Sequence, residues 1–333
     1  MRIGLLGLGR IGAFHAGTLA GLPAVGSLVV SDPVPARARD AAERFGAHVA
    51  GTPGALLASG VDGVVIAAAT EAHPELLQLC VAAGVPTFCE KPVARDAAEA
   101  AAVARRVAGA GVEIQIGYPR RFDAAFAAAR AAVAGGDLGW VHTIRSTTLD
   151  PAPPPRDYLA ASGGIFRDCS VHDFDAIRWV TGQEVAEVYA AGGNRGPGWF
   201  RELDDVDTAS AVLTLADGAL AVVSNSRYNA RGYDVRLELH GSEDSIAAGL
   251  EPRLPLRSAE PHVSFPDGQP YTFFMDRFAG AFRAELVAFT EVVAGRRTSP
   301  CPLADALEAS WIAEACTVSL REHRPVRIEE ARP

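Results

Sequence analysis

The stretch Cys89-Glu90-Lys91-Pro92 contains the single lysine among the 31 basic residues of the chain. It follows an apolar run at residues 85–88 that predicts a strand, so we expect Lys91 at a strand's carboxyl end, where open α/β sheets bind their ligands. An ammonium is a compact donor that can lose its proton when buried, whereas a guanidinium cannot. One lysine in an arginine-using chain suggests a site that needs an amine. Codon drift toward arginine explains the position alone equally well.

A second candidate lies in the segment SGGIFRDCSVHDFD at residues 162–175. Helical spacing over 168–179 puts Asp168 and His172 four residues apart on one face. A carboxylate beside an imidazole holds its tautomer and stabilises the imidazolium formed on taking a proton, which suits a general base for an alcohol. For an isolated DxxxH, a helix N-terminus with acidic residues facing its dipole is the favoured alternative.

The turn GLGRIG at residues 7–12 follows an apolar run at 2–6 and opens a helix-like stretch. In a dinucleotide fingerprint Gly7 permits the tight turn, Gly9 lets a pyrophosphate approach the backbone, and Gly12 lets helix and strand pack closely. We therefore predict a dinucleotide site here, with Arg10 and Ile11 at the helix N-terminus as further contacts.

Asp32 completes this fingerprint, because it ends a second strand at 27–31, twenty residues past Gly12. Its carboxylate can accept hydrogen bonds from the ribose hydroxyls of NAD, whereas a 2′-phosphate would place like charges together. Pro33 supplies no cation to offset that repulsion, so NAD is favoured over NADP, although Arg37 is near enough to blur the preference.

Alternating elements position these residues in the first half. Helices are expected at 35–45, 74–83 and 96–108, and further strands at 47–49, 61–68, 85–88 and 113–116. This alternation predicts a six-stranded, doubly wound parallel sheet, a Rossmann domain over 1–119. Thr70 and His73 lie just past the fourth strand on the cofactor side, where His73 is equally suited to capping the next helix.

The second half, residues 120–333, predicts an α/β domain on an open, mostly antiparallel sheet. An alanine-rich helix opens it at 120–136, and 150–155 is a stiff, proline-rich connector. Strand-like runs follow at 140–149, 185–191, 208–215, 219–226 and 233–239, with a hairpin turn at Asp217-Gly218. Two helices, 278–294 and 303–320, close the chain.

Together these segments resemble the glucose–fructose oxidoreductase/inositol dehydrogenase/rhizopine catabolism (Gfo/Idh/MocA) superfamily of NAD(P)-dependent oxidoreductases. The supporting motifs are GLGRIG at 7–12, SDP at 31–33, CEKPVA at 89–94 and HDFD at 172–175. Four longer segments are similar to the inositol 2-dehydrogenase branch of this superfamily. They are GYPRRFD at 117–123, DPAPPPRDYLAASGGIFRDCSVHDFD at 150–175, DDVDTA at 204–209 and RGYDVRLELHGS at 231–242.

The resemblance implies a Lys-Asp-His catalytic set at Lys91, Asp168 and His172, with Glu90 and Lys91 among the cofactor contacts. It also implies polyol contacts at Arg121, Tyr233 and Asp150, and an open sheet that mediates oligomer contacts, usually in a homotetramer. Tyr118-Pro119 departs from the Phe-Asn or similar pair expected before the two arginines, which bears on the identity of the polyol more than on the chemistry.

The totals exclude several classes of function. A net charge of −9 without a basic cluster argues against a nucleic-acid partner. Five scattered cysteines without metal-ligand spacing indicate reduced thiols in a cytoplasmic protein and no metal site. The chain shows no signal-peptide pattern, and no apolar run reaches the roughly 20 residues that span a bilayer.

The resulting hypothesis is reversible NAD-dependent oxidation of a secondary ring alcohol of a cyclic polyol, such as myo-inositol, to a ketone. An NAD(P)-dependent dehydrogenase or ketoreductase for an aldose or another sugar is one alternative. The other is a non-catalytic NAD-binding sensor on the same fold, which would have no need of Lys91 or His172.

Overall fold

The computed structural model describes residues 1–332, which form two compact units. The first contains 1–119 together with 282–307, and the second contains 120–281 and the chain from 308 onward. The break after Pro119 coincides with the predicted domain boundary, whereas 282–307 was assigned by sequence to the second half.

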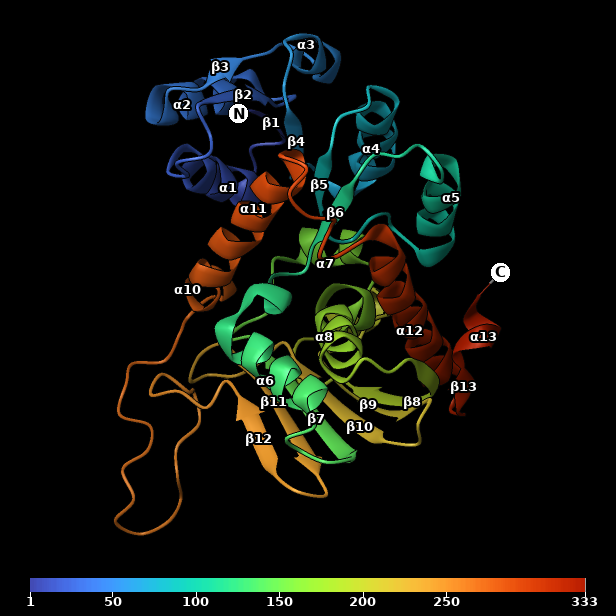
Figure 1. Ribbon diagram of the computed structural model, residues 1–333. Helices are drawn as coiled ribbons and strands as arrows, with labels where there is room; N and C mark the ends of the chain where they lie inside the picture. The colour runs from blue at the N-terminus through green and yellow to red at the C-terminus, as the bar shows by residue number, and fades with distance from the viewer. Residues whose placement is uncertain (333) are drawn as a thin grey trace. The chain divides into compact units, whose positions relative to one another are not determined.

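A parallel sheet of six strands organises the first unit within residues 1–332 (Figure 1). Its order, β3-β2-β1-β4-β5-β6, is the doubly wound order predicted from the sequence. All its neighbouring strands pair in parallel. The strands are β1 (Arg2–Leu6), β2 (Ser27–Ser31), β3 (His48–Val49), β4 (Gly63–Ile66), β5 (Thr87–Glu90) and β6 (Ile114–Gly117).

Side chains on both faces of this sheet are buried, because helices pack against each face. Ile3 and Leu5 belong to the main hydrophobic core, whereas a Cβ built on Gly4 between them would meet Leu56 of α3. The helices are α1 (Arg10–Ala20), α2 (Pro35–Phe45), α3 (Pro53–Ala58), η1 (Thr70–Ala72), α4 (His73–Ala82), α5 (Ala97–Val107) and α11 (Ala279–Val293).

Helix α11 explains why residues 282–307 belong to the first unit. Leu286, Phe289 and Val292 recur at helical spacing and are buried in the same core as β1. A Cβ on Gly63 of β4 would meet side chains of this helix. The apolar face of α11 is therefore satisfied by the parallel sheet, a long-range contact that helical periodicity alone does not reveal.

A mixed sheet of seven strands organises the second unit within the described chain, in the order β12-β11-β7-β10-β9-β8-β13. Its pairs are antiparallel except for β7 with β10, and Asp217-Gly218 joins β9 to β10 as predicted. The strands are β7 (Val141–Leu149), β8 (Val185–Gly193), β9 (Thr208–Leu215), β10 (Leu220–Ser226), β11 (Asp234–Gly241), β12 (Ser245–Ala248) and β13 (Val326–Arg327).

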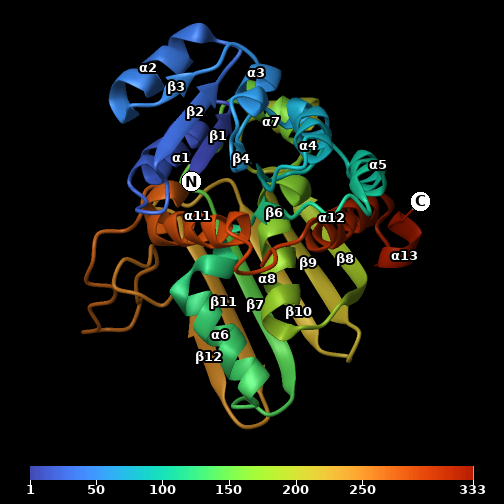
Figure 2. The same ribbon diagram turned by 45° about the horizontal axis from the view of Figure 1, so that its top comes forward.

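One face of this sheet is covered and the other is open. Helices α6 and α8 contact each other and lie along one face (Figure 2). Along β9, Ala209, Ala211 and Leu213 are buried, whereas Ser210 and Val212 between them are exposed. The helices of the second half are η2 (Pro119–Phe122), α6 (Ala124–Gly135), α7 (Arg156–Ser162), the π-turn η3 (Phe166–Ser170), α8 (Val171–Thr181), α9 (Trp199–Glu202), α10 (Phe274–Arg277), α12 (Leu303–Glu322) and α13 (Ile328–Ala331).

All five cysteines are buried free thiols. Over residues 1–332, none of the helices combines the length and the apolar character that crossing a membrane would require.

Candidate active site

The turn between β1 and α1 has the geometry of a phosphate-binding loop. Gly7 adopts φ +92°, which favours glycine, and its N–H donates to the carbonyl of Ser31 at 2.9 Å. A Cβ on Gly12 would lie 2.0 Å from the Gly7 carbonyl oxygen, whereas a Cβ on Gly9 would meet nothing within 4 Å. The turn is thus closed toward the sheet and open at Gly9. No side chain caps α1, so its first N–H groups suit a pyrophosphate.

Asp32 holds this turn from the end of β2. One carboxylate oxygen accepts from the Leu8 N–H at 2.6 Å and the other from the Val34 N–H at 2.8 Å. The guanidinium of Arg37 lies 3.8 Å away and is half exposed. The carboxylate is therefore oriented at the place where an adenosine ribose is expected. A cavity of about 250 Å³ beside it is lined by Leu8, Ala13, Ala36, Arg37, Asp40, Ala41 and Phe45.

His73 links the loops that follow β4 and β5. Its ring is buried, with Nδ1 2.7 Å from the Pro92 carbonyl and Nε2 3.1 Å from the Ala68 carbonyl. Burial lowers the pKa of His73, and the two carbonyl contacts and nearby carboxylates only partly oppose this effect. Both ring nitrogens therefore face backbone, and the ring fixes the loop that contains Lys91.

The other residues predicted to contact the cofactor lie at the carboxyl ends of the strands or at the start of α1. Glu90 ends β5, and its carboxylate is 2.6 Å from Nε2 of His15. Lys91 follows at once and is half-buried, as is Thr70 in η1. At the start of α1, Arg10 is exposed and Ile11 is half-buried.

In the second unit, Arg227 joins two of the predicted residues. Its guanidinium donates to Asp150 at 3.1 Å and to Asp168 at 2.8 Å. The hydroxyl of Tyr158 donates to the other oxygen of Asp168 at 2.8 Å. Burial opposes the charge on Arg227, but the two carboxylates outweigh this effect and raise its pKa, so the guanidinium stays charged. Neither Arg227 nor Tyr158 was predicted as a site residue.

A π-turn separates Asp168 from His172. Asp168 lies within η3 (Phe166–Ser170), and His172 is the second residue of α8. The continuous α-helix expected over 168–179 is therefore replaced at its start by a wider turn, which changes the angular offset between these two side chains. Such single π-turns are frequent at functional sites.

A buried polar network supports this region from the sheet side. Asp173 is fully buried and accepts hydrogen bonds from Arg120 at 2.7 Å, Ser146 at 2.6 Å and Asn225 at 2.8 Å. Thr148 also donates to Asp173 and receives a bond from Arg120. A buried charge that is fully bonded in this way fixes α8 on the strands.

Two predicted polyol contacts, Arg121 and Tyr233, are buried in the second unit. Arg121 forms a buried ion pair with Asp175, with Nη2 2.5 Å from the carboxylate. The Tyr233 ring packs near Phe274 and Phe278, and burial raises the pKa of its phenol, which is therefore neutral. Their substrate roles stay predictions.

These features define a dinucleotide-binding Rossmann protein with a second, polar α/β unit. Residues 1–118 match the model of an oxidoreductase family with an NAD-binding Rossmann fold, and 126–247 match the GFO/IDH/MocA C-terminal domain. The chain belongs to the GFO/IDH/MocA family of oxidoreductases.

Relatives support this assignment over nearly the full length. Myo-inositol dehydrogenase Hyg17 of Streptomyces leeuwenhoekii is 38% identical, over 90% of each chain. Inositol 2-dehydrogenase of Rhizobium meliloti is 35% identical, over 98% of this chain and 99% of the relative. A crystal structure of scyllo-inositol dehydrogenase from Lactobacillus casei, with bound NAD(H) and scyllo-inositol, matches with a TM-score of 0.88 at 27% identity, over 99% of each chain.

Proposed function

We propose that this chain is an NAD-dependent dehydrogenase that oxidises a secondary ring hydroxyl of a cyclic polyol, with myo-inositol going to 2-keto-inositol. The observation that carries the proposal is the similarity to dehydrogenases named for inositol, which extends through both compact units. The glycine turn and oriented Asp32 supply a fitting NAD site, and Asp32 is the reason to favour NAD over NADP.

In this proposal NAD supplies the hydride acceptor, and the chain aligns the alcohol and moves its proton. His172 takes the hydroxyl proton and is oriented by Asp168, whose carboxylate is itself fixed by Arg227 and Tyr158. Lys91 hydrogen-bonds the same oxygen and stabilises the charge that develops on it.

The remaining polar residues bind the other hydroxyls. Asp150, Arg121 and Tyr233 are proposed to contact the polyol. Asp150 is also hydrogen-bonded to Arg227 and is partly exposed, so it can accept from a hydroxyl group without losing its partner.

The decisive experiment follows NADH formation with myo-inositol, other inositols and glucose. Lys91→Arg should lower turnover far more than tenfold while NAD still binds, because a guanidinium cannot place a compact donor at the same point. Near-normal turnover in this variant would exclude the role of Lys91. His172→Ala should abolish the pH dependence of the base, and an unchanged pH–rate profile would reassign it.

The same screen separates the alternatives. Faster reduction of NAD with glucose than with any inositol would favour an aldose dehydrogenase. Tight NAD binding without reduction by any polyol would favour a non-catalytic sensor.

We further propose that the protein works in the cytoplasm as a homotetramer assembled through the open face of the second sheet. Among the residues that this face presents to solvent, Val212 and Val222 are 42% and 40% exposed, and Leu220 is 48% exposed. Sedimentation of wild type and Val212→Lys tests this: the wild type should be tetrameric and the variant smaller.

A further inference from the structure

A buried cluster of titratable groups lies in the first unit beside the strand end that precedes Lys91. His15 of α1, Glu90 of β5 and Glu285 of α11 each offer a ligand atom, and these atoms lie within 4.8 Å of one another. His15 and Glu285 are completely buried, and the Glu90 side chain is 13% exposed.

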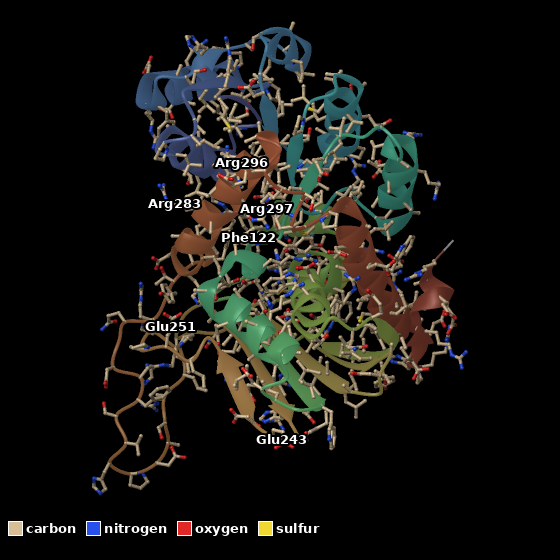
Figure 3. The ribbon with its side chains drawn as sticks, in the orientation of Figure 1. Phe122, Glu243, Glu251, Arg283, Arg296 and Arg297 are labelled. Carbon is tan, nitrogen blue, oxygen red and sulfur yellow. The ribbon has the colours of Figure 1, made fainter. Side chains whose placement is uncertain are left out.

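The surroundings of this cluster are apolar. The His15 ring meets the Phe88 ring edge-on at 5.7 Å and the Phe282 ring at 5.9 Å. Two polar side chains come from neighbouring strands: the Cys89 thiol, whose pKa burial raises so that it stays neutral, and the amide of Gln115, which donates to the backbone carbonyl of Glu285. Figure 3 labels Arg283 on α11, and this side chain is exposed, as are Arg296 and Arg297 beyond the helix end.

The cluster contains more acceptors than donors. Nε2 of His15 lies 2.6 Å from Oε1 of Glu90. A neutral imidazole has one N–H group, and this hydrogen bond to Glu90 uses it. Nδ1 of His15 and both carboxylate oxygens of Glu285 are buried and have no hydrogen-bond partner. Burial, and then the charge of Glu90, raise the pKa of Glu285 well above its ordinary value.

On its other side, the carboxylate of Glu90 packs closely against a glycine of the neighbouring strand. Gly117 pairs with Glu90 across β5 and β6, and a Cβ built on Gly117 would lie 3.0 Å from Oε2 of Glu90. The side chain of Gln115 donates to the backbone carbonyl of Glu285 at 3.0 Å, which fixes α11 at that residue. The carboxylate of Glu90 is thus confined between His15 and strand β6.

We propose that Glu285 is a positioning residue. As a neutral carboxylic acid it supplies the second hydrogen-bond donor of the His15–Glu90–Glu285 cluster and donates to the carboxylate of Glu90, which lies within 4.8 Å. This hydrogen bond fixes Glu90 and the adjacent Lys91. The role of Lys91 rests on the proposed function, whereas the protonation of Glu285 does not. A divalent cation is the competing explanation for two carboxylates and an imidazole. Two ligands of one tetrahedral zinc ion lie about 3.4 Å apart, so the 2.6 Å contact between His15 and Glu90 fits a shared proton better.

Infrared difference spectra of the full-length protein test the protonation directly. At neutral pH, Glu285→Gln minus wild type should show loss of a protonated carboxylic acid C=O band. Loss of ionised carboxylate bands instead would overturn the proposal, and so would one divalent metal ion per chain found by elemental analysis of the purified protein.

Matched substitutions test the donor. Glu285→Gln keeps a neutral donor of the same shape, and Glu285→Met removes it at similar volume. NAD affinity is measured by fluorescence titration. It should stay within about twofold of wild type for Glu285→Gln and fall about tenfold for Glu285→Met. Equal affinities of the two folded variants would refute the donor role. Turnover with a polyol should follow the same order. If the wild type oxidises no polyol, the proposed function fails, while the infrared band and the NAD titration still decide the role of Glu285.

Discussion

Replacing Arg227 by methionine should destabilise the second unit by about 3 kcal/mol. The guanidinium is 2% exposed and donates to Asp168 and Asp150, whose side chains are 10% and 20% exposed. Breaking a buried ion pair costs about 3–5 kcal/mol, because a charge is left uncompensated. We place the cost at the lower end, since water still reaches both carboxylates and screens their repulsion.

The assay is urea unfolding at neutral pH, with Arg156→Met as the matched control. Arg156 pairs with Glu202 at 2.6 Å, but both side chains are more than half exposed, so the same substitution there should cost less than about 0.5 kcal/mol. Arg227→Lys should fall between the two, because an ammonium keeps the charge but loses the fork that reaches both carboxylates. Equal losses for Arg227→Met and Arg156→Met would refute the reasoning.

Two further predictions concern the first unit. Gly12→Ala should lower the free energy of unfolding by more than about 2 kcal/mol and weaken NAD binding, because its Cβ would lie 2.0 Å from the Gly7 carbonyl oxygen. A Cβ at Gly9 would meet open space, so Gly9→Ala should weaken NAD binding about tenfold with little loss of stability. Thermal unfolding and NAD titration of both variants separate these effects, and equal stabilities would contradict them. The pKa of His73 is lowered in the folded state, so the unfolded chain takes up the proton first as the pH falls. The stability present above pH 6.5 is therefore lost below it, by up to about 1.4 kcal/mol per pH unit. His73→Gln should lack this part of the slope below about pH 6.5, and parallel urea midpoints of the two proteins would count against the assignment.

Local patterns predicted the first sheet well because its strands are short apolar runs bounded by glycines and polar turns. The strands β1 and β2 have the predicted bounds, whereas β5 begins two residues later than expected and includes Glu90. The apolar run at 85–88 starts in the turn after α4, where the Val85 N–H bonds to the Cys80 carbonyl, and Pro86 cannot donate to the sheet. A charged residue at a strand end is also missed by a search for apolar runs, although pairing with Gly117 keeps it in the sheet.

The predicted site was less complete, because its supporting contacts are distant in sequence. Asp168 and Asp150 could be proposed from their motifs, but Arg227 lies 59 and 77 residues from them and reads as an ordinary arginine at the end of a strand. The π-turn at η3 likewise has no periodic signal, since one extra residue in a turn shifts the offset between Asp168 and His172 without changing the composition.

The residues that escaped prediction share a physical role, which is to satisfy a buried charge or a buried acceptor supplied by another part of the chain. Arg227 does this for two carboxylates in the second unit, and Asp173 receives its donors from β7, β10 and the start of the second unit. Such partners have no fixed spacing, because only the folded sheet decides which strand ends become neighbours. A buried polar atom without a partner is therefore the more informative signal, and in the first unit it leads from His15 to Glu285 on a helix that the sequence had assigned to the other half.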